Sequence, residues 1–274
     1  MKSISYKTFL YIGITILTIF YLGPFLFTVM TSLKPEAEVY SLSLPSQLIF
    51  DRYVDVITYP EYLPAMLNSI IVSVCTVPLI LLLASPAAYA ITRFRELKGR
   101  SLFFMLFLIM MLLPLPAVIG YLYLFTSSVG IYDTKLGVIL VYAGIFTPLA
   151  VWILSTYFRG VPKELEEAAM IDGASMFKIF TSVILPVSLP GLAVTTIISF
   201  ISIWSEFIVA FTITLSLESR TVTVGTFVFT GTLYELNWPE VAAASVIATI
   251  PVAIVAFMMQ RYIVKGLISG IIRA

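Results

Sequence analysis

Long apolar runs dominate this 274-residue chain and limit what it can fold into. A helix needs about 20 mainly apolar residues to cross a bilayer. Six runs meet this requirement, at roughly 8–33, 64–92, 101–127, 136–158, 184–213 and 239–264. Because lipid offers no partners to backbone polar groups, such runs cross as helices. The sequence therefore predicts an all-α membrane protein, with six transmembrane helices in a single transmembrane domain covering residues 1–274.

Prolines lie within several of these runs, and neighbouring helices can satisfy the backbone groups that a proline frees. We therefore expect kinked helices. The first run follows Lys2 and Lys7 and is longer than the apolar core of about 7–15 residues found in signal peptides. No Ala-x-Ala cleavage site follows it. We expect an uncleaved membrane anchor.

The basic residues indicate the orientation. With six spans, the N-terminus, segments 93–100 and 159–183 and the C-terminal tail share one side, which holds 12 of the 16 basic residues. The other side holds only Lys34, Arg52, Lys135 and Arg220. Basic residues concentrate in cytoplasmic loops. The count predicts a multi-pass protein of the cell membrane with both termini in the cytoplasm.

Several kinds of chemistry are disfavoured by composition. The chain has no histidine, one cysteine and a net charge of +1. A histidine base, a histidine metal site and an internal disulfide are therefore excluded, and no basic field suggests nucleic acid. No G-x-x-x-x-G-K-[ST] phosphate loop occurs either. We predict a protein that is not itself an enzyme, with no catalytic residues, no metal and no cofactor bound by this chain.

One polar segment stands between the fourth and fifth runs. Pro162 and Glu164, Glu166 and Glu167 are typical of a helix start. Residues further along recur at helical spacing and predict one helix face, with small residues at its beginning and large apolar residues at its end. These residues are Ala169, Gly173, Met176, Phe177 and Phe180. Such a face is suited to docking in a groove of another protein, but it also fits a helix lying on the membrane surface.

The spacing of this segment resembles a known motif. Glu167-Ala168-Ala169 is followed after three residues by Gly173, and after nine more by Val183-x-Leu185-Pro186. This resembles the EAA loop of ABC importer membrane subunits, EAA, three residues, G, nine residues, I-x-L-P, with Val183 in place of isoleucine. That loop lies between the fourth and fifth spans in the cytoplasm, as predicted here.

The resemblance extends along nearly the whole chain to the carbohydrate branch of these permeases, the maltose-permease (MalG-like) group. The residues that carry it are Ser32-Leu33-Lys34, Asn68-Ser69, Ala87-Ala88-Tyr89-Ala90, Gly130-x-x-Asp133-Thr134, Pro162-x-Glu164-Leu165, Trp204-Ser205-Glu206-Phe207 and Gln260-Arg261-Tyr262. The family usually reads W-N-E-F at 204–207. Ser205 departs from this pattern, so a role for an asparagine amide does not carry over.

The resemblance implies a permease subunit of a prokaryotic ATP-driven sugar importer. Its expected partners are a second homologous permease, two ATP-binding cassette ATPase subunits and an extracytoplasmic sugar-binding protein, with ATP and Mg²⁺ bound by the ATPases. Residues 162–182 would form the coupling helix, with Glu167, Ala168, Ala169, Gly173, Leu185 and Pro186 at the ATPase contact. Residues 266–274 form a second candidate contact with the ATPases.

Four residues are candidates for the translocation path or its gate: Asn68, Trp204, Ser205 and Glu206. A carboxylate inside a span faces a partner or a watery cavity. Glu206 and Trp204 would therefore either contact sugar, through hydrogen bonds and ring stacking, or hold neighbouring helices or subunits together. Asn68 raises the same question, because an asparagine there would also serve as a helix cap.

Two other functions remain alternatives. An importer of a non-sugar such as glycerol phosphate would share these motifs. An ion-coupled secondary transporter usually carries several intramembrane charges and repeated halves, which this sequence does not show. Co-purification with an ATPase subunit distinguishes the importers from a secondary transporter.

Overall fold

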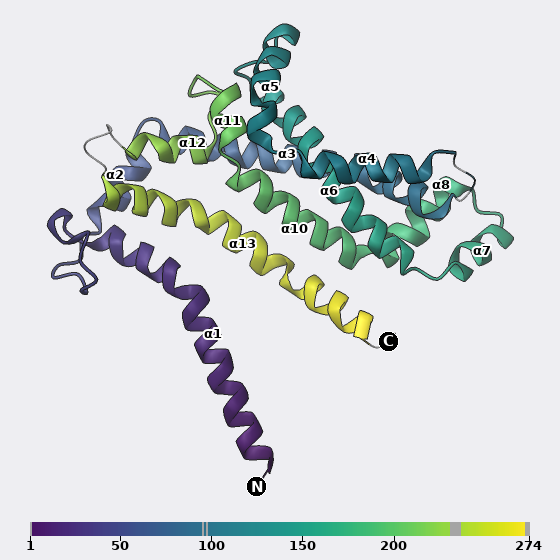
Figure 1. Cartoon of the computed structure of the whole chain (residues 1–274), viewed down its shortest axis with the longest axis horizontal. Helices are drawn as coiled ribbons and strands as arrows, with labels where there is room; N and C mark the ends of the chain where they lie inside the picture. The colour runs from purple at the N-terminus through teal and green to yellow at the C-terminus, as the bar shows by residue number, and fades with distance from the viewer. Residues whose placement is uncertain (1, 95, 97, 231–236, 272–274) are drawn as a thin grey trace. The chain divides into compact units, whose positions relative to one another are not determined.

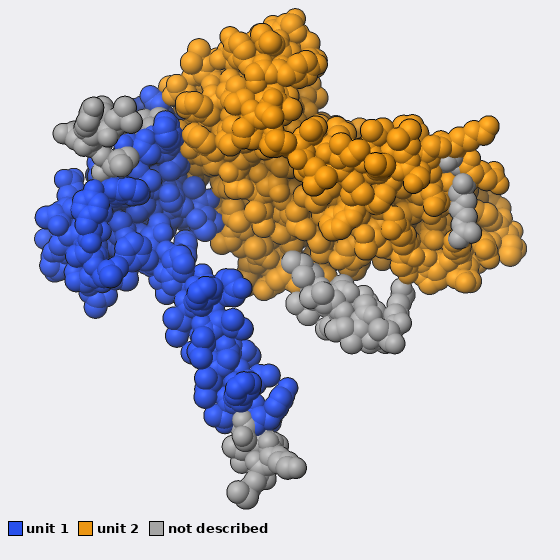
Figure 2. Space-filling view, viewed as in Figure 1, with its two compact units in different colours: residues 1–63, 225–250 blue, residues 64–224, 251–274 orange. Residues whose placement is uncertain are grey.

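The structure is a computed structural model that describes residues 2–94, 96, 98–230 and 237–271. In that part of the chain every regular element is a helix (Figure 1). The all-α class predicted from the apolar runs is therefore confirmed. The chain divides into two compact units, residues 1–63 with 225–250 and residues 64–224 with 251–274 (Figure 2).

The first unit contains α1 (Lys2–Leu33), a 3-10 turn at Glu36–Glu38, α2 (Asp51–Thr58) and the first part of α13 (Trp238–Ile271). Two of its basic side chains are paired internally. The fully buried Lys34 donates from Nζ to the Ser41 carbonyl over 2.6 Å, and Arg52 pairs with Glu240 at 3.4 Å. The segment 34–63 thus contains a helix and two buried basic side chains.

Helix α6 (Lys135–Arg159) lies at the centre of the second unit and packs against α4 (Arg100–Leu112) and α10 (Leu189–Ser205). It contributes the fully buried side chains of Val138, Tyr142, Leu154 and Phe158. A Cβ atom added at Gly191 of α10 would lie 2.4 Å from Cγ of Tyr157. Glycine therefore allows α10 and α6 to approach more closely than any other residue would.

The second unit also contains α3 (Tyr62–Arg93) from Pro64 onward, α5 (Leu115–Val129), α11 (Ile208–Ile213) and the start of α12 (Val222–Phe227). α11 packs on α5 and α6. Thr134 caps α6, because its hydroxyl accepts a hydrogen bond from the Gly137 N–H at 3.0 Å. These contacts fix the ends of the helices that hold the polar clusters described below.

The run predicted as one span at 101–127 is broken. α4 and α5 meet at an angle of 99° around Leu113 and Pro114. Leu113 precedes a proline and has φ −67° and ψ 120°, the extended conformation that a following proline imposes. Pro116 then lies in the first turn of α5, where its missing N–H costs no hydrogen bond.

The run predicted at 184–213 is broken twice. Residues 176–187 and α10 meet at 76° around Ser188, between Pro186 and Pro190, where the sequence predicts a bend. The second break was not expected: α10 ends at Ser205, Glu206 is extended, and α11 begins at Ile208.

Among the described residues, four helices are long and apolar enough to cross a membrane, and there are up to six spans if each bent pair forms one. The four begin at Tyr6, Tyr62, Lys135 and Trp238. The two bent pairs correspond to the third and fifth runs. Six spans in one transmembrane domain stay a prediction, as does the orientation of the two termini.

Candidate functional site

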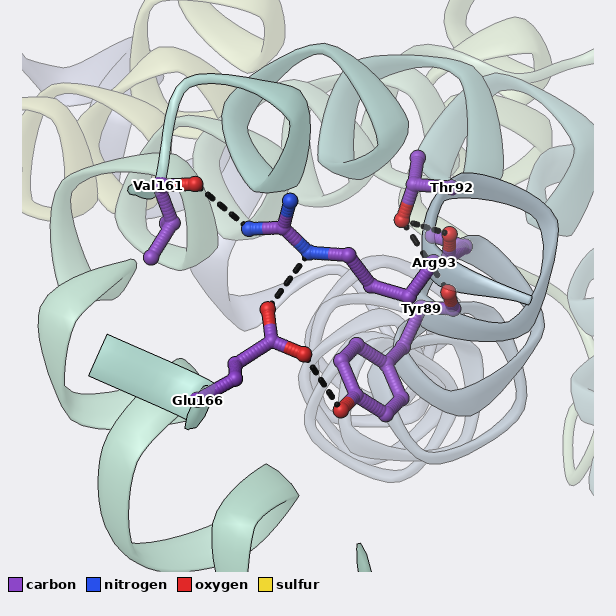
Figure 3. A network of polar contacts seen from close by, with 6 residues as sticks. Tyr89, Thr92, Arg93, Val161 and Glu166 are labelled. Carbon is purple, nitrogen blue, oxygen red and sulfur yellow. Dashed lines mark hydrogen bonds and ion pairs between the residues drawn. The ribbon is translucent and has the colours of Figure 1, made fainter. Parts of the chain in front are cut away.

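The polar segment after α6 is anchored by a buried carboxylate. Glu166 of α7 (Glu164–Ile171) is 6% exposed and accepts a hydrogen bond from the Tyr89 hydroxyl at 3.0 Å. Its other oxygen pairs with Nε of Arg93 at 2.6 Å, and Nη2 of Arg93 donates to the Val161 carbonyl at 2.5 Å. Figure 3 shows this carboxylate between the two side chains of α3. The network ties both the entry to α7 and its first turn to the end of α3.

α7 ends in a turn formed around Gly173. The Gly173 N–H donates to the Met170 carbonyl and the Ala174 N–H to the Ala169 carbonyl, each at 3.0 Å. Gly173 has φ +77°, and a Cβ there would meet open space. The bonds are those of a helix end with a left-handed residue. Glycine is therefore suited to this position by its backbone conformation, not by close packing.

This turn corrects the prediction of one continuous helix over 162–182. A second helix, α8 (Met176–Ile179), begins after Ser175, whose hydroxyl accepts from the Lys178 N–H at 3.4 Å. Because the chain changes direction at Gly173, Ala169, Met176 and Phe177 do not share one helical face. We call residues 164–179 the α7–α8 segment.

The α7–α8 segment presents apolar side chains to its surroundings. Ile171 is 87% exposed and Phe177 is 76% exposed, on either side of the turn. Glu167 and Ala168 are exposed and Ala169 is half-buried. The helical spacing of the sequence predicts Phe177 on this face but not Ile171, because Ile171 would lie off the face if the helix continued through Gly173.

The base of the segment is buried. Ile179 at the end of α8 and Ile184 are fully buried, and the Phe180 ring packs on Tyr89 with centroids 5.1 Å apart. A π-helical turn at Phe180–Ile184 leads into α9 (Leu185–Val187). Of the last two motif residues, Leu185 is half-buried and Pro186 is exposed. Tyr89 thus contacts both α7, through Glu166, and the start of the π-helical turn.

A second buried carboxylate, Glu206, lies at the break between α10 and α11. It is 9% exposed and accepts a hydrogen bond from the Tyr142 hydroxyl at 2.8 Å. It also accepts from the N–H groups of Val209 and Ala210, at 2.9 to 3.1 Å. A carboxylate at a helix N-terminus satisfies N–H groups that have no partner within the helix. Glu206 therefore ties the start of α11 to α6.

The neighbours of Glu206 differ in exposure. Trp204 is 5% exposed, and its ring stacks on Phe200 with centroids 5.5 Å apart. Ser205 is exposed, and its hydroxyl donates to the Ile201 carbonyl one turn earlier. Thr223 donates to the Glu206 carbonyl at 2.8 Å, which adds the start of α12 to this cluster.

Asn68 joins three parts of the second unit. Its side-chain amide donates to the carbonyls of Leu217 and Arg220, at 2.8 and 3.0 Å, and its oxygen accepts from Lys135 Nζ at 3.2 Å. Asn68 does not cap a helix, because α3 begins at Tyr62. The adjacent Ser69 accepts from the Val222 N–H at 2.7 Å. This part of α3 therefore holds the 214–222 segment in place.

Asp133, in the turn between α5 and α6, binds the same segment. Its carboxylate accepts from the N–H groups of Leu215 and Ser216, at 2.7 and 2.9 Å, and from the Ser219 hydroxyl. Partial burial raises the pKa of this carboxyl, but the hydrogen bonds outweigh it and hold the pKa below its usual value. Asp133 has φ +57°, a conformation that aspartate and asparagine adopt more readily than most residues.

Comparison with known proteins identifies the family. Residues 78–269 match the family described as "Binding-protein-dependent transport system inner membrane component". The chain belongs to this family. The matched region includes the α7–α8 segment, the Glu206 cluster and the Tyr89–Arg93 end of α3. Both buried carboxylate sites are therefore parts of a transport permease fold.

Individual relatives span the whole chain. The chain is 37% identical over 270 residues to the trehalose/maltose transport system permease protein MalG of Thermococcus litoralis, covering 97% of each chain. It is 33% identical to the trehalose transport system permease protein SugB of Mycobacterium tuberculosis, covering 91% of this chain and 92% of SugB. A bacterial alginate importer chain shares the fold, with a TM-score of 0.76, 24% identity, and 94% and 97% of the two chains covered.

Proposed function

We propose that this chain is a permease subunit of an ATP-driven importer for a sugar of the maltose or trehalose class. Family membership and whole-length similarity to two permeases of trehalose transport systems support the sugar class. The family description names a dependence on a binding protein. The proposed complex contains this subunit, a second homologous permease, two ATPase subunits that bind ATP and Mg²⁺, and an extracytoplasmic sugar-binding protein, in the plasma membrane of a prokaryote.

The α7–α8 segment is the proposed ATPase contact. Its exposed Ile171 and Phe177 flank a glycine turn, and its base is fixed to α3 by Glu166. A docking surface that is firmly attached to the helices behind it moves with them as a rigid body. Ile171 and Phe177 would insert into the ATPase groove, and Glu167, Ala168 and Ala169 would line its edge. Leu185 and Pro186 would carry the movement into α10.

At the other end of α10, the Glu206 cluster is proposed to hold the gate together. Both carboxylate oxygens of Glu206 already accept hydrogen bonds from Tyr142, Val209 and Ala210. A sugar hydroxyl would have to compete with these donors. Glu206 is thus assigned a positioning role for α11, and Asn68 the same role for the 214–222 segment. The exposed Ser205 remains a candidate for a direct sugar contact, whereas Trp204, which is buried and stacked on Phe200, is assigned to the gate.

Uptake into vesicles tests the proposed function. The chain is purified with the subunits that accompany it, reconstituted with its binding protein, and supplied with labelled trehalose, maltose or glycerol 3-phosphate. We expect ATP-dependent uptake of one of the two sugars. Uptake of glycerol phosphate alone would contradict the sugar class, and uptake driven by an ion gradient without ATP would contradict the importer assignment.

A further inference from the structure

A basic pocket of about 410 Å³ opens where four helix ends of the second unit meet. It lies at the end of α3, the start of α4, the end of α6 and the approach to α7. Its lining residues are Ile91, Thr92, Arg93, Arg100, Ser101, Phe104, Arg159 and Lys163. Four cationic side chains therefore converge on one cavity that belongs to neither the Glu206 cluster nor the exposed face of the α7–α8 segment.

The positive charge of this pocket is mostly uncompensated. Arg93 pairs with Glu166. Within the described part of the chain, Arg100, Arg159 and Lys163 form no ion pair with any carboxylate. The guanidinium of Arg159 lies over the Phe104 ring, 5.2 Å from its centroid. Like charges held together without a counter-ion repel one another, so the pocket favours an anion.

Beside the pocket, α4 presents an apolar surface. Leu102, Phe103, Met105 and Leu106 follow the pocket residue Ser101 directly, and each is between 45% and 60% exposed. The site thus combines a cationic, hydroxyl-bearing cavity with exposed apolar side chains that lie within about one and a half turns of Ser101 on the same helix. This combination matches a ligand with an anionic head and a hydrocarbon tail.

We propose that the pocket binds the headgroup of an anionic phospholipid, such as phosphatidylglycerol, with the acyl chains lying along α4. The phosphate would accept charge-assisted hydrogen bonds from Arg100 and Arg159 and a hydrogen bond from the Ser101 hydroxyl. Basic pockets at the ends of membrane helices suit such headgroups. A free phosphate or a carboxylate of a protein partner would occupy the cationic cavity but make no contact with the apolar side chains beside it on α4.

Counting bound lipids tests this assignment. The full chain, with the subunits that accompany it, is purified in a neutral detergent and titrated with phosphatidylglycerol or phosphatidylcholine, and the adducts are counted by native mass spectrometry. We expect a saturable phosphatidylglycerol site with no phosphatidylcholine equivalent. A basic residue near a lipid surface contributes about 1 kcal/mol. Arg100→Gln and Arg159→Gln should therefore each weaken phosphatidylglycerol binding by about fivefold.

Lys98→Gln is the matched control, because Lys98 lies two residues before Arg100 but does not line the pocket. It should leave binding unchanged. An equal loss in Lys98→Gln would overturn the site in favour of general surface charge. Displacement of the lipid by millimolar inorganic phosphate would overturn it in favour of a free-phosphate site. Unchanged lipid binding in Arg100→Gln, together with loss of a co-purifying protein subunit, would assign the pocket to a protein partner.

Discussion

Glu166 and Glu167 are adjacent and chemically identical, yet they have different surroundings. Glu166 is buried between Tyr89 and Arg93, whereas Glu167 is exposed. The difference follows from helix geometry, because neighbouring residues on a helix point about 100° apart. The family motif begins at Glu167, so motif reading singles out the exposed carboxylate and passes over the one that anchors α7.

Replacing Glu166 should destabilise the protein more than replacing Glu167. Glu166→Gln removes the ion pair and leaves the Arg93 charge buried, at a cost of roughly 2 kcal/mol. Glu167→Gln is the control and should have little effect. The measurement is the unfolding temperature of each purified variant. Equal unfolding temperatures for the two variants would show that the Glu166 network does not anchor α7.

Asp133 should make a contribution to the stability of the folded protein that is lost in acid. Its pKa is lower in the folded protein than in the unfolded chain, where it is about 3.9. The ionised form therefore stabilises the fold above pH 4, and this contribution is lost as the pH falls through the folded pKa. Asp133→Asn keeps a residue that tolerates positive φ but removes the charge.

Unfolding temperatures measured from pH 7 down to pH 3 check this prediction. The wild type should be more stable than Asp133→Asn at neutral pH, and the gap should narrow below pH 4. Asp55→Asn in α2, outside this cluster, controls for general charge effects. A gap that stays constant across the whole range would contradict the assigned pKa direction.

At the scale of elements, the α7–α8 segment is a pair of short helices whose relative direction is set by one glycine turn. An L-residue in the left-handed conformation costs about 1–2 kcal/mol, and asparagine is the usual exception. Gly173→Ala should therefore favour continuing α7 through the turn, which would move Phe177 away from Ile171.

Uptake and ATP hydrolysis, measured together in vesicles, check this effect. The complex that carries Gly173→Ala should take up less sugar per ATP hydrolysed by its ATPase subunits, and Gly173→Asn should recover much of this ratio. Because a Cβ at Gly173 meets open space, crowding within the chain does not explain a loss in the alanine variant. Equal loss in the alanine and asparagine variants would mean that the backbone conformation is not the cause.

The apolar runs predicted the positions of the long apolar helices, because the length of an apolar run is a local property of the sequence. The bend around Ser188 was also predicted, since Pro186 and Pro190 flank it. The break at Glu206 has no proline or glycine beside it. It depends on Tyr142, 64 residues earlier, and on the N-terminus of α11. Tyr89 and Arg93, the partners of Glu166, are likewise distant from it in sequence. Local sequence patterns therefore do not reveal the contacts of either carboxylate.

For the whole molecule, the permease family assignment and the proposed complex explain why apolar side chains are exposed, because lipid or other subunits would cover them. α1 has no buried residue in its most apolar window, which is consistent with contact to lipid or to another subunit. The α7–α8 segment exposes apolar side chains in a predicted cytoplasmic region, where we propose that a protein partner, not the membrane surface, covers them. We propose that an ATPase subunit covers Ile171 and Phe177 and moves the chain through them.

The ratio of sugar taken up to ATP hydrolysed tests this claim most directly. Phe177→Ala is compared with Phe9→Ala on α1, because the two phenylalanines are 76% and 77% exposed. Removing a large anchor from an interface costs about 2 kcal/mol or more of binding free energy. We predict that Phe177→Ala lowers the ratio at least severalfold while Phe9→Ala retains it. An unchanged ratio in Phe177→Ala would contradict coupling through the α7–α8 segment.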